Sequence, residues 1–261
     1  MNLFKLAWTY MRIGALNELQ YRVNFLIQLL QSLIAVGTGL VGLALVFGQV
    51  NELAGWSQAE LLAVMGVHIM MGGIIRSVIQ PNMERIMEDV LNGTLDFALV
   101  KPADAQTLVS IREFRFWQLT DVLIGLIVIS VAVYQLQANM SMLQVLAFVA
   151  ALMMGAIMIY CVWLIVTSIA FWAVRVHEII DLFQGLYAAG RWPVGIYPDW
   201  LRNGLTFLVP VAFAVTVPAE AITNRLTAQS LLFAAALTLM FAVLARVVWR
   251  LGLRNYSGAS A

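Results

Sequence analysis

The side chains that could carry out chemistry are few in this sequence, and their spacing fits no common catalytic or metal-binding pattern. His68 and His177 are the two histidines, and Cys161, the one cysteine, lies inside the apolar run IMIYCVWLIV. The motifs HExxH, CxxC and GxSxG, which would mark a metal or nucleophilic site, do not occur. We therefore expect no catalytic residue, no metal site and no cofactor, and we interpret Cys161 as a packed hydrophobic residue.

The sequence also lacks the usual motif for binding ATP phosphates. That motif, GxxxxGK[ST], requires a lysine that follows a glycine. The only lysines are Lys5, which follows Phe4, and Lys101, which follows Val100. Any ATP that drives this protein must then be hydrolysed by a partner.

The composition indicates an integral membrane protein. Of the 261 residues, 62% are hydrophobic and 11% are charged, whereas a soluble domain has about 25% charged residues. The net charge of +1 creates no strong field that would attract nucleic acid. We expect an all-α membrane protein in which residues 1–261 form a single transmembrane domain.

A helix that spans a bilayer needs about 20 mostly apolar residues, and six stretches predict such spans. They are residues 24–48, 59–79, 116–136, 143–173, 177–197 and 229–249. The fifth span is weak because it carries several polar side chains. Residues 1–22 predict an N-terminal interfacial helix, with Lys5, Thr9 and Arg12 on one side; the alternative is that they are the polar start of the first span.

The distribution of basic residues predicts that both termini are cytoplasmic, in a plasma (inner) membrane. With six spans, all of the 15 basic residues except Arg191, Arg202 and Arg225 lie on the inner side. The apolar run 205–217 is short and broken by a proline, so we expect residues 199–222 to form a re-entrant helical pair between spans five and six. Its gate would consist of Pro198, Trp200, Pro210, Phe213 and Pro218.

Residues 80–115 form the longest cytoplasmic segment and predict a short helix of their own between spans two and three. Asn82 is a good N-cap, and Gly93 provides a left-handed stop. Between them lies one apolar stripe, formed by Met83, Ile86, Met87, Val90 and Leu91. Together with the acidic Glu84 and Glu88, this helix would either dock on a soluble partner or pack on its own chain with solvated acids; the spacing leaves both open.

Several polar side chains are expected at membrane depth, where an unpaired charge costs at least about 2.5 kcal/mol. One face of the fifth span would line the translocation pathway or a subunit interface, and it carries Asp181, Gln184, Ala188 and Arg191. Alternatively, Glu178 and Asp181 pair with Arg175 and only anchor the helix. Asp121 is expected to pair with a basic residue, and His68 to be packed and hydrogen-bonded.

Three stretches resemble the permeases of ABC-2-type exporters. GTLDFALVKP (93–102) is similar to that family's loop between spans two and three. YPDWLRNGLTFLVPVAFAVTVPAE (197–220) is similar to its re-entrant region, and ELQYRVNF (18–25) to its link between interfacial helix and first span. In this order and spacing, the resemblance covers nearly the whole chain.

The resemblance implies a permease subunit of an exporter that forms half of a translocation pathway. The implied partners are a cytoplasmic ABC ATPase subunit in two copies, a second permease that is identical or paralogous, and membrane lipid. Residues 83–91 would be the coupling helix, with ATPase contacts from Met83, Glu84, Ile86, Met87, Glu88, Val90 and Leu91. An ATP-independent secondary transporter or channel is the alternative, but it would favour more intramembrane charge and an inverted repeat.

Overall fold

The fold is all-helical, as expected from the sequence. The computed structural model describes residues 3–19, 22–102, 104–138, 140–172 and 177–256. Five helical stretches in this part of the chain are long and apolar enough to cross a membrane, and they confirm five of the six predicted spans: Val23–Phe47, Gln58–Leu91, Phe116–Gln135, Met142–Phe171 and Ala228–Asn255. Cys161, in the fourth of these, is a buried free cysteine, as expected.

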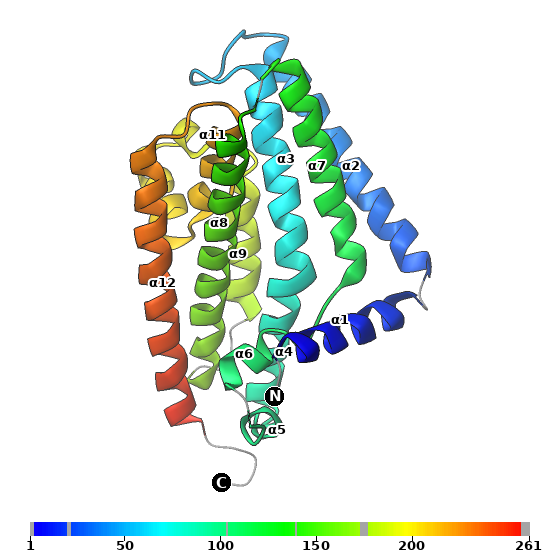
Figure 1. The fold of residues 1–261 in the computed structure, drawn as a ribbon, viewed down its shortest axis with the longest axis vertical. Coiled ribbons are helices and arrows are strands. Elements are labelled where there is room, and N and C mark those ends of the chain that lie inside the picture. Colours follow the sequence, from blue (N-terminus) through cyan, green and yellow to red (C-terminus); the bar gives the residue numbers. More distant parts are fainter. Residues whose placement is uncertain (1–2, 20–21, 103, 139, 173–176, 257–261) are drawn as a thin grey trace.

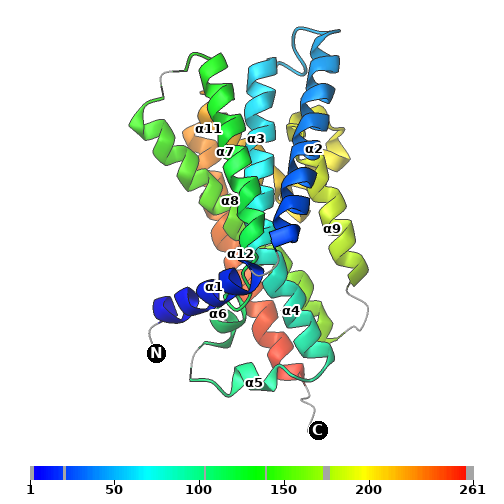
Figure 2. The ribbon, with the colours of Figure 1, turned by 90° about the vertical axis from the view of Figure 1, so that its right-hand side faces the viewer.

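The long helices run along one axis, and the first helix crosses it (Figure 1). This first helix is α1 (Leu3–Leu19), and its interfacial location stays a prediction. The helices along the axis are α2 (Arg22–Phe47), α3 (Gln58–Ile74), α7 (Leu119–Gln135), α8 (Met142–Ser168) and α12 (Ala228–Asn255). Helix α1 and the C-terminal end of α12 lie toward the same end of the molecule in both views (Figure 2).

The fifth predicted span, residues 177–197, is wrong in its length. Helix α9 (His177–Ala189) has 13 residues, and a helix of that length covers only about 20 Å at 1.5 Å per residue. A bilayer core is about 30 Å thick. The helix stops because Gly190 and Pro193 follow it, and only the short η4 (Val194–Ile196) continues the chain.

The region predicted to be re-entrant consists of two short helical arms, and the chain bends by 77° between them. Its elements are α10 (Asp199–Asn203), η5 (Gly204–Leu208), η6 (Ala212–Thr216) and α11 (Val217–Ile222). Pro198 and Trp200 lie at the exposed start of the first arm, and Pro210 lies in the bend. Phe213 and Pro218 are buried in the second arm.

The second span continues without interruption into residues 80–91, contrary to the prediction of a separate helix capped by Asn82. Helix α3, the π-helical turn η1 (Ile75–Ile79) and α4 (Gln80–Leu91) form one helix of 34 residues. Pro81 has no N–H group to donate to the carbonyl of Ser77, four residues earlier. The N–H of Arg115 donates to that carbonyl instead, at 2.9 Å, and the wider π turn gives the proline ring room.

Helices α3 and α7 approach each other closely because glycines face each other across their contact. A Cβ atom on Gly125 would lie 2.6 Å from the backbone N of Met70, and one on Gly66 would lie 2.9 Å from the backbone N of Ile129. Membrane helices use small residues in this way, since lipid supplies no hydrophobic force between them. The pair therefore forms a rigid centre for the bundle.

We expect Gly125→Val to lower the melting temperature of the purified protein markedly. The new side chain meets backbone atoms that cannot move aside, and overpacking of this kind costs about 1–3 kcal/mol or more. Gly37→Val in α2 is the matched control, because a Cβ there meets nothing within 4 Å. Thermal unfolding in detergent measures both variants, and equal melting temperatures would contradict the close α3–α7 contact.

Candidate functional site

A platform of short helices projects from one end of the bundle. It consists of α4, α5 (Asp96–Leu99) and α6 (Ala105–Val109), and α5 lies beyond α1 along the long axis (Figures 1 and 2). Three members of the predicted apolar stripe, Met83, Ile86 and Met87, are fully buried within this chain. Of the two alternatives that the spacing leaves open, these three residues follow the one in which the helix packs on its own chain, because α8 and η3 (Ile169–Phe171) pack on α4.

The acidic residues of α4 are largely paired within the chain. Buried Asp89 forms ion pairs with Arg112 and, at 3.4 Å, with Arg85. Glu84 pairs with Arg115 at 2.8 Å. Glu88 lies 3.7 Å from Arg85 and keeps 55% of its side chain exposed. The predicted alternative, in which the helix packs on its own chain, thus holds for most of its length.

Asn82 is a buried clamp between α4 and the segment that enters the third span. Its amide nitrogen donates to the carbonyl oxygens of Val78, at 2.7 Å, and Glu113, at 2.8 Å. Its amide oxygen accepts from the backbone N–H groups of Arg112, at 2.8 Å, and Glu113, at 2.9 Å. All four hydrogen-bonding positions of the amide are used. The sequence suggested an N-cap for Asn82, and only its position beside an apolar stripe hinted at burial.

The end of α4 turns the chain into α5 and exposes apolar side chains at the tip of the platform. Gly93 has a φ of +69°, as predicted, and the N–H of Thr94 returns to the carbonyl of Asp89 at 2.8 Å, which is a Schellman stop. Phe97 and Val100 are 73% and 79% exposed, and Leu91 is 41% exposed. We call these three residues the tip patch.

Asp104 ties the other end of the platform to the last span. Its Oδ1 accepts from the N–H of Thr107 at 3.0 Å and so caps α6. Its Oδ2 pairs with Arg246 of α12 at 2.5 Å. The hydrogen bond from Arg246 lowers the pKa of Asp104 to about 2, so this link is charged at neutral pH.

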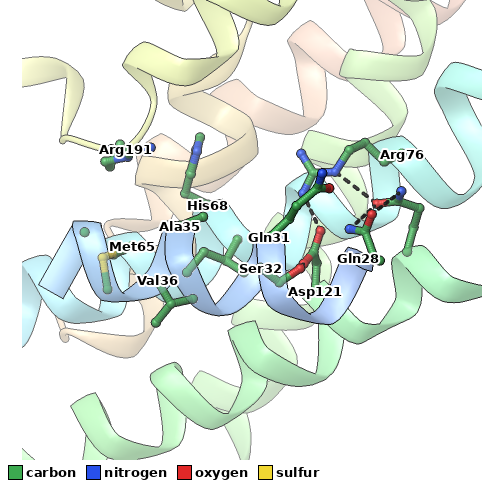
Figure 3. Close-up of a pocket in the computed structure, with 13 residues that line it drawn as sticks. Gln28, Gln31, Ser32, Ala35, Val36, Met65, His68, Arg76, Asp121 and Arg191 are labelled. Carbon is green, nitrogen blue, oxygen red and sulfur yellow. Dashed lines mark hydrogen bonds and ion pairs between the residues drawn. The ribbon is translucent and has the colours of Figure 1, made fainter. Parts of the chain in front are cut away.

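A cluster of polar side chains around Arg76 and Asp121 lies between α2, α3 and α7 (Figure 3). Arg76 Nη2 pairs with Asp121 Oδ2 at 2.6 Å, and Arg76 Nε donates to Gln118 at 3.3 Å. The hydroxyl of Ser32 also donates to buried Asp121. The expected pairing of Asp121 with a basic residue is thus confirmed.

His68 is packed as expected, but its hydrogen bonding is incomplete. Its ring stacks on that of Tyr187 at 4.7 Å between centroids, and the Tyr187 hydroxyl donates to the His68 carbonyl at 2.8 Å. Its buried Nδ1 has no hydrogen-bond partner among the described residues. Helix α9 is thereby fastened to the middle of the α3–α4 helix.

The predicted polar face of the fifth helix is open. Asp181, Gln184 and Ala188 are all exposed, and so is Arg191, just beyond the helix end. Arg191 lies near His68 (Figure 3), and His68 is about 15 Å along α3 from the first residue of that helix. Arg175 lies outside the described residues, as does the side chain of Glu178.

The comparisons with known proteins agree with this architecture. The sequence profile of one family, described as ABC-2 family transporter protein, matches residues 33–260. Neither the comparison with curated proteins nor that with solved structures finds a match. The matched residues include all five long helices but the start of the first, the platform and the re-entrant pair. The chain therefore belongs to the ABC-2 transporter family, and it is a multi-pass permease of the kind that works with an ABC ATPase.

Proposed function

We propose that this protein is the permease subunit of an ABC exporter, that it forms half of a translocation pathway, and that a separate cytoplasmic ATPase drives it. The family membership supports the permease role. The observation that supports coupling to an ATPase is the tip patch. It exposes one aromatic and two aliphatic side chains. Large apolar side chains that stay exposed outside the spans are typical of a contact for another protein.

The proposed ATPase contact is smaller than the sequence suggested and lies farther along the chain. Of the seven coupling residues predicted from the sequence, Glu88 and Leu91 are exposed and would touch the ATPase together with Phe97 and Val100. The other five support this surface from behind: Met83, Glu84, Ile86, Met87 and Val90. Aromatic and aliphatic anchors ringed by charge are typical of the centre of a protein interface.

Asn82 gives the proposed mechanical link from this surface to the spans. A displacement of the tip patch moves α4, and Asn82 passes it to residues 112–113 through three hydrogen bonds. Those residues lead directly into the third span. The N–H of Trp117, at the start of that span, donates to Glu18 of α1 at 2.8 Å, so the interfacial helix is drawn in as well.

The open face of α9 supports a second permease subunit. Asp181 is exposed and has no ion pair with a described residue, and lipid is a costly environment for such a charge. A pathway between two subunits would solvate Asp181, Gln184 and Arg191 together. The proposed assembly has two permeases, identical or paralogous, and two ATPase subunits in the plasma membrane, with all termini and platforms cytoplasmic.

The function is tested by purifying the tagged chain from its own cells in a mild detergent. We expect it to retain an ATPase with a phosphate-binding loop, two copies of each subunit per particle, and ATP hydrolysis that depends on the complex. Transport by the chain alone in liposomes, with no ATPase present, would instead support the secondary-transporter alternative.

We expect Phe97→Asp to abolish stimulation of the ATPase and to leave the melting temperature of the permease unchanged, because 73% of Phe97 is exposed. Met87→Asp should lower the melting temperature, because it buries a charge within the chain. ATPase assays and thermal unfolding separate the two effects. Asn255→Asp, an exposed position at the end of α12, controls for added charge, and normal stimulation by Phe97→Asp would refute the proposed contact.

We expect Asn82→Leu to uncouple the two proteins while they still co-purify. The substitution leaves the N–H groups of Arg112 and Glu113 without their acceptor, at about 1–3 kcal/mol each, and it cuts the link between α4 and the third span. Asn82→Asp keeps the acceptor oxygens and should retain part of the stimulation. ATPase activity per bound complex is the readout, and exposed Asn203→Leu is the control. Full stimulation by Asn82→Leu would exclude Asn82 from transmission.

A further inference from the structure

Two cavities flank the middle of the α3–α4 helix and share one wall. The first, of about 380 Å³, lies between α2, α3 and α7 (Figure 3). The second, of about 470 Å³, lies between α3, α8 and α9. His68, Arg76 and Arg191 line both. We call the two cavities together the arginine crevice.

The charged side chains of the arginine crevice carry an excess of positive charge. Arg76, Arg115 and Arg191 line it, and Asp121 is the only acidic side chain among its lining residues. Asp121 neutralises Arg76, and Glu84, from outside the crevice, neutralises Arg115. Arg191 forms no ion pair or side-chain hydrogen bond with any residue whose side chain the structure describes. The excess therefore resides on Arg191.

The position of Arg191 makes its lack of a partner significant. It lies beside His68, far from both ends of a helix of 34 residues, so its charge is at membrane depth. Charges at such depth pair with an opposite charge or mark a ligand path. Arg76 Nη1 and Nη2 are within reach of the same space, since 42% of its side chain is exposed.

The other lining residues of the crevice are mixed: Gln28, Gln31 and Ser32 line the first cavity, whereas the second has an aromatic wall. Val36 and Ile69 also line the first cavity, and Trp163 and Phe183 line the second, with their rings 4.9 Å apart. Each cavity is also larger than a single oxyanion requires and falls in the range of ligand sites, about 300–1,000 Å³. A ligand that fits both features has one anionic group and a hydrocarbon portion.

We propose that the arginine crevice binds an anionic amphiphile, with a phosphate or carboxylate head group held by Arg191 beside Arg76 and a hydrocarbon chain along the aromatic wall. A guanidinium group suits both head groups, because its N–H groups match their paired oxygens. The binding site stands on the cavities and charges alone; its role as a cargo site rests on the proposed permease function.

The test measures binding to the full-length chain, purified in a maltoside detergent with its ATPase where one is retained, by native mass spectrometry. Dodecyl phosphate is the probe, dodecylphosphocholine has the same chain with a zwitterionic head, and inorganic phosphate lacks the chain. We expect one molecule of dodecyl phosphate to bind per permease chain, and the other two compounds to bind at least tenfold more weakly.

The variants test which residue holds the head group. Arg191→Gln should weaken dodecyl phosphate binding about tenfold or more, as expected for a lost charge-assisted hydrogen bond, and Arg191→Lys should weaken it less. Ala188→Glu places an acid in the crevice and should also weaken binding; Ala188 is exposed there, so folding is preserved. Arg202→Gln removes a cation that lines neither cavity and should have no effect.

Equal binding of dodecylphosphocholine, or unchanged affinity in both Arg191→Gln and Ala188→Glu, would overturn the proposal. A further arm identifies the source of the ligand: reconstitution with phosphatidylglycerol that blocks the probe identifies a bilayer lipid, and probe binding that persists identifies a single-chain amphiphile. Both outcomes support the site. Binding without ATPase coupling would refute the proposed function alone, and coupling without binding would refute this inference alone.

Discussion

The hydrogen bond from the Arg115 N–H to the Ser77 carbonyl is the interaction on which the rest of the architecture depends. It fills the gap that Pro81 leaves in the helix, and so allows one helix to run from Gln58 to Leu91. That continuity carries α4 out of the bundle as a rigid arm. It also brings the start of the third span against the second, since Arg115 immediately precedes Phe116.

The same continuous helix carries both the ion pair between Arg76 and Asp121 and the hydrogen bonds of Asn82. Arg76 lies in its π-helical turn and pairs with Asp121 of α7, while Asn82, six residues on, clamps the chain that leads into α7. The close glycine contacts between α3 and α7 continue this attachment along the bundle. In the proposed coupling, a force at the tip patch would act on the second and third spans together, and both of them line the arginine crevice.

The sequence predicted those features that a local pattern determines. Apolar length predicted five spans, the proline-rich run predicted the bent pair, and Gly93 predicted the end of α4. The predictions from the sequence failed where contacts between residues far apart in the chain determine the structure. Asn82 has the residue type of an N-cap, and only the approach of residues 112–115 turns it into a buried clamp. Met83, Ile86 and Met87 have the spacing of a docking face, and α8 covers them because that helix returns beside α4. Arg191 follows α9, which ends before Gly190. The apolar run predicted a longer helix and so did not reveal this end.

The most direct test of this account is cross-linking between the permease and its ATPase from single introduced cysteines, since the native Cys161 is buried and unreactive toward a polar reagent. Phe97→Cys and Met87→Cys are compared in the assembled complex with a short thiol-reactive cross-linker. The account predicts that position 97 cross-links to the ATPase and that position 87 does not. A cross-link from position 87 with none from position 97 would show that the buried stripe is the contact, and would contradict the continuous, internally packed arm.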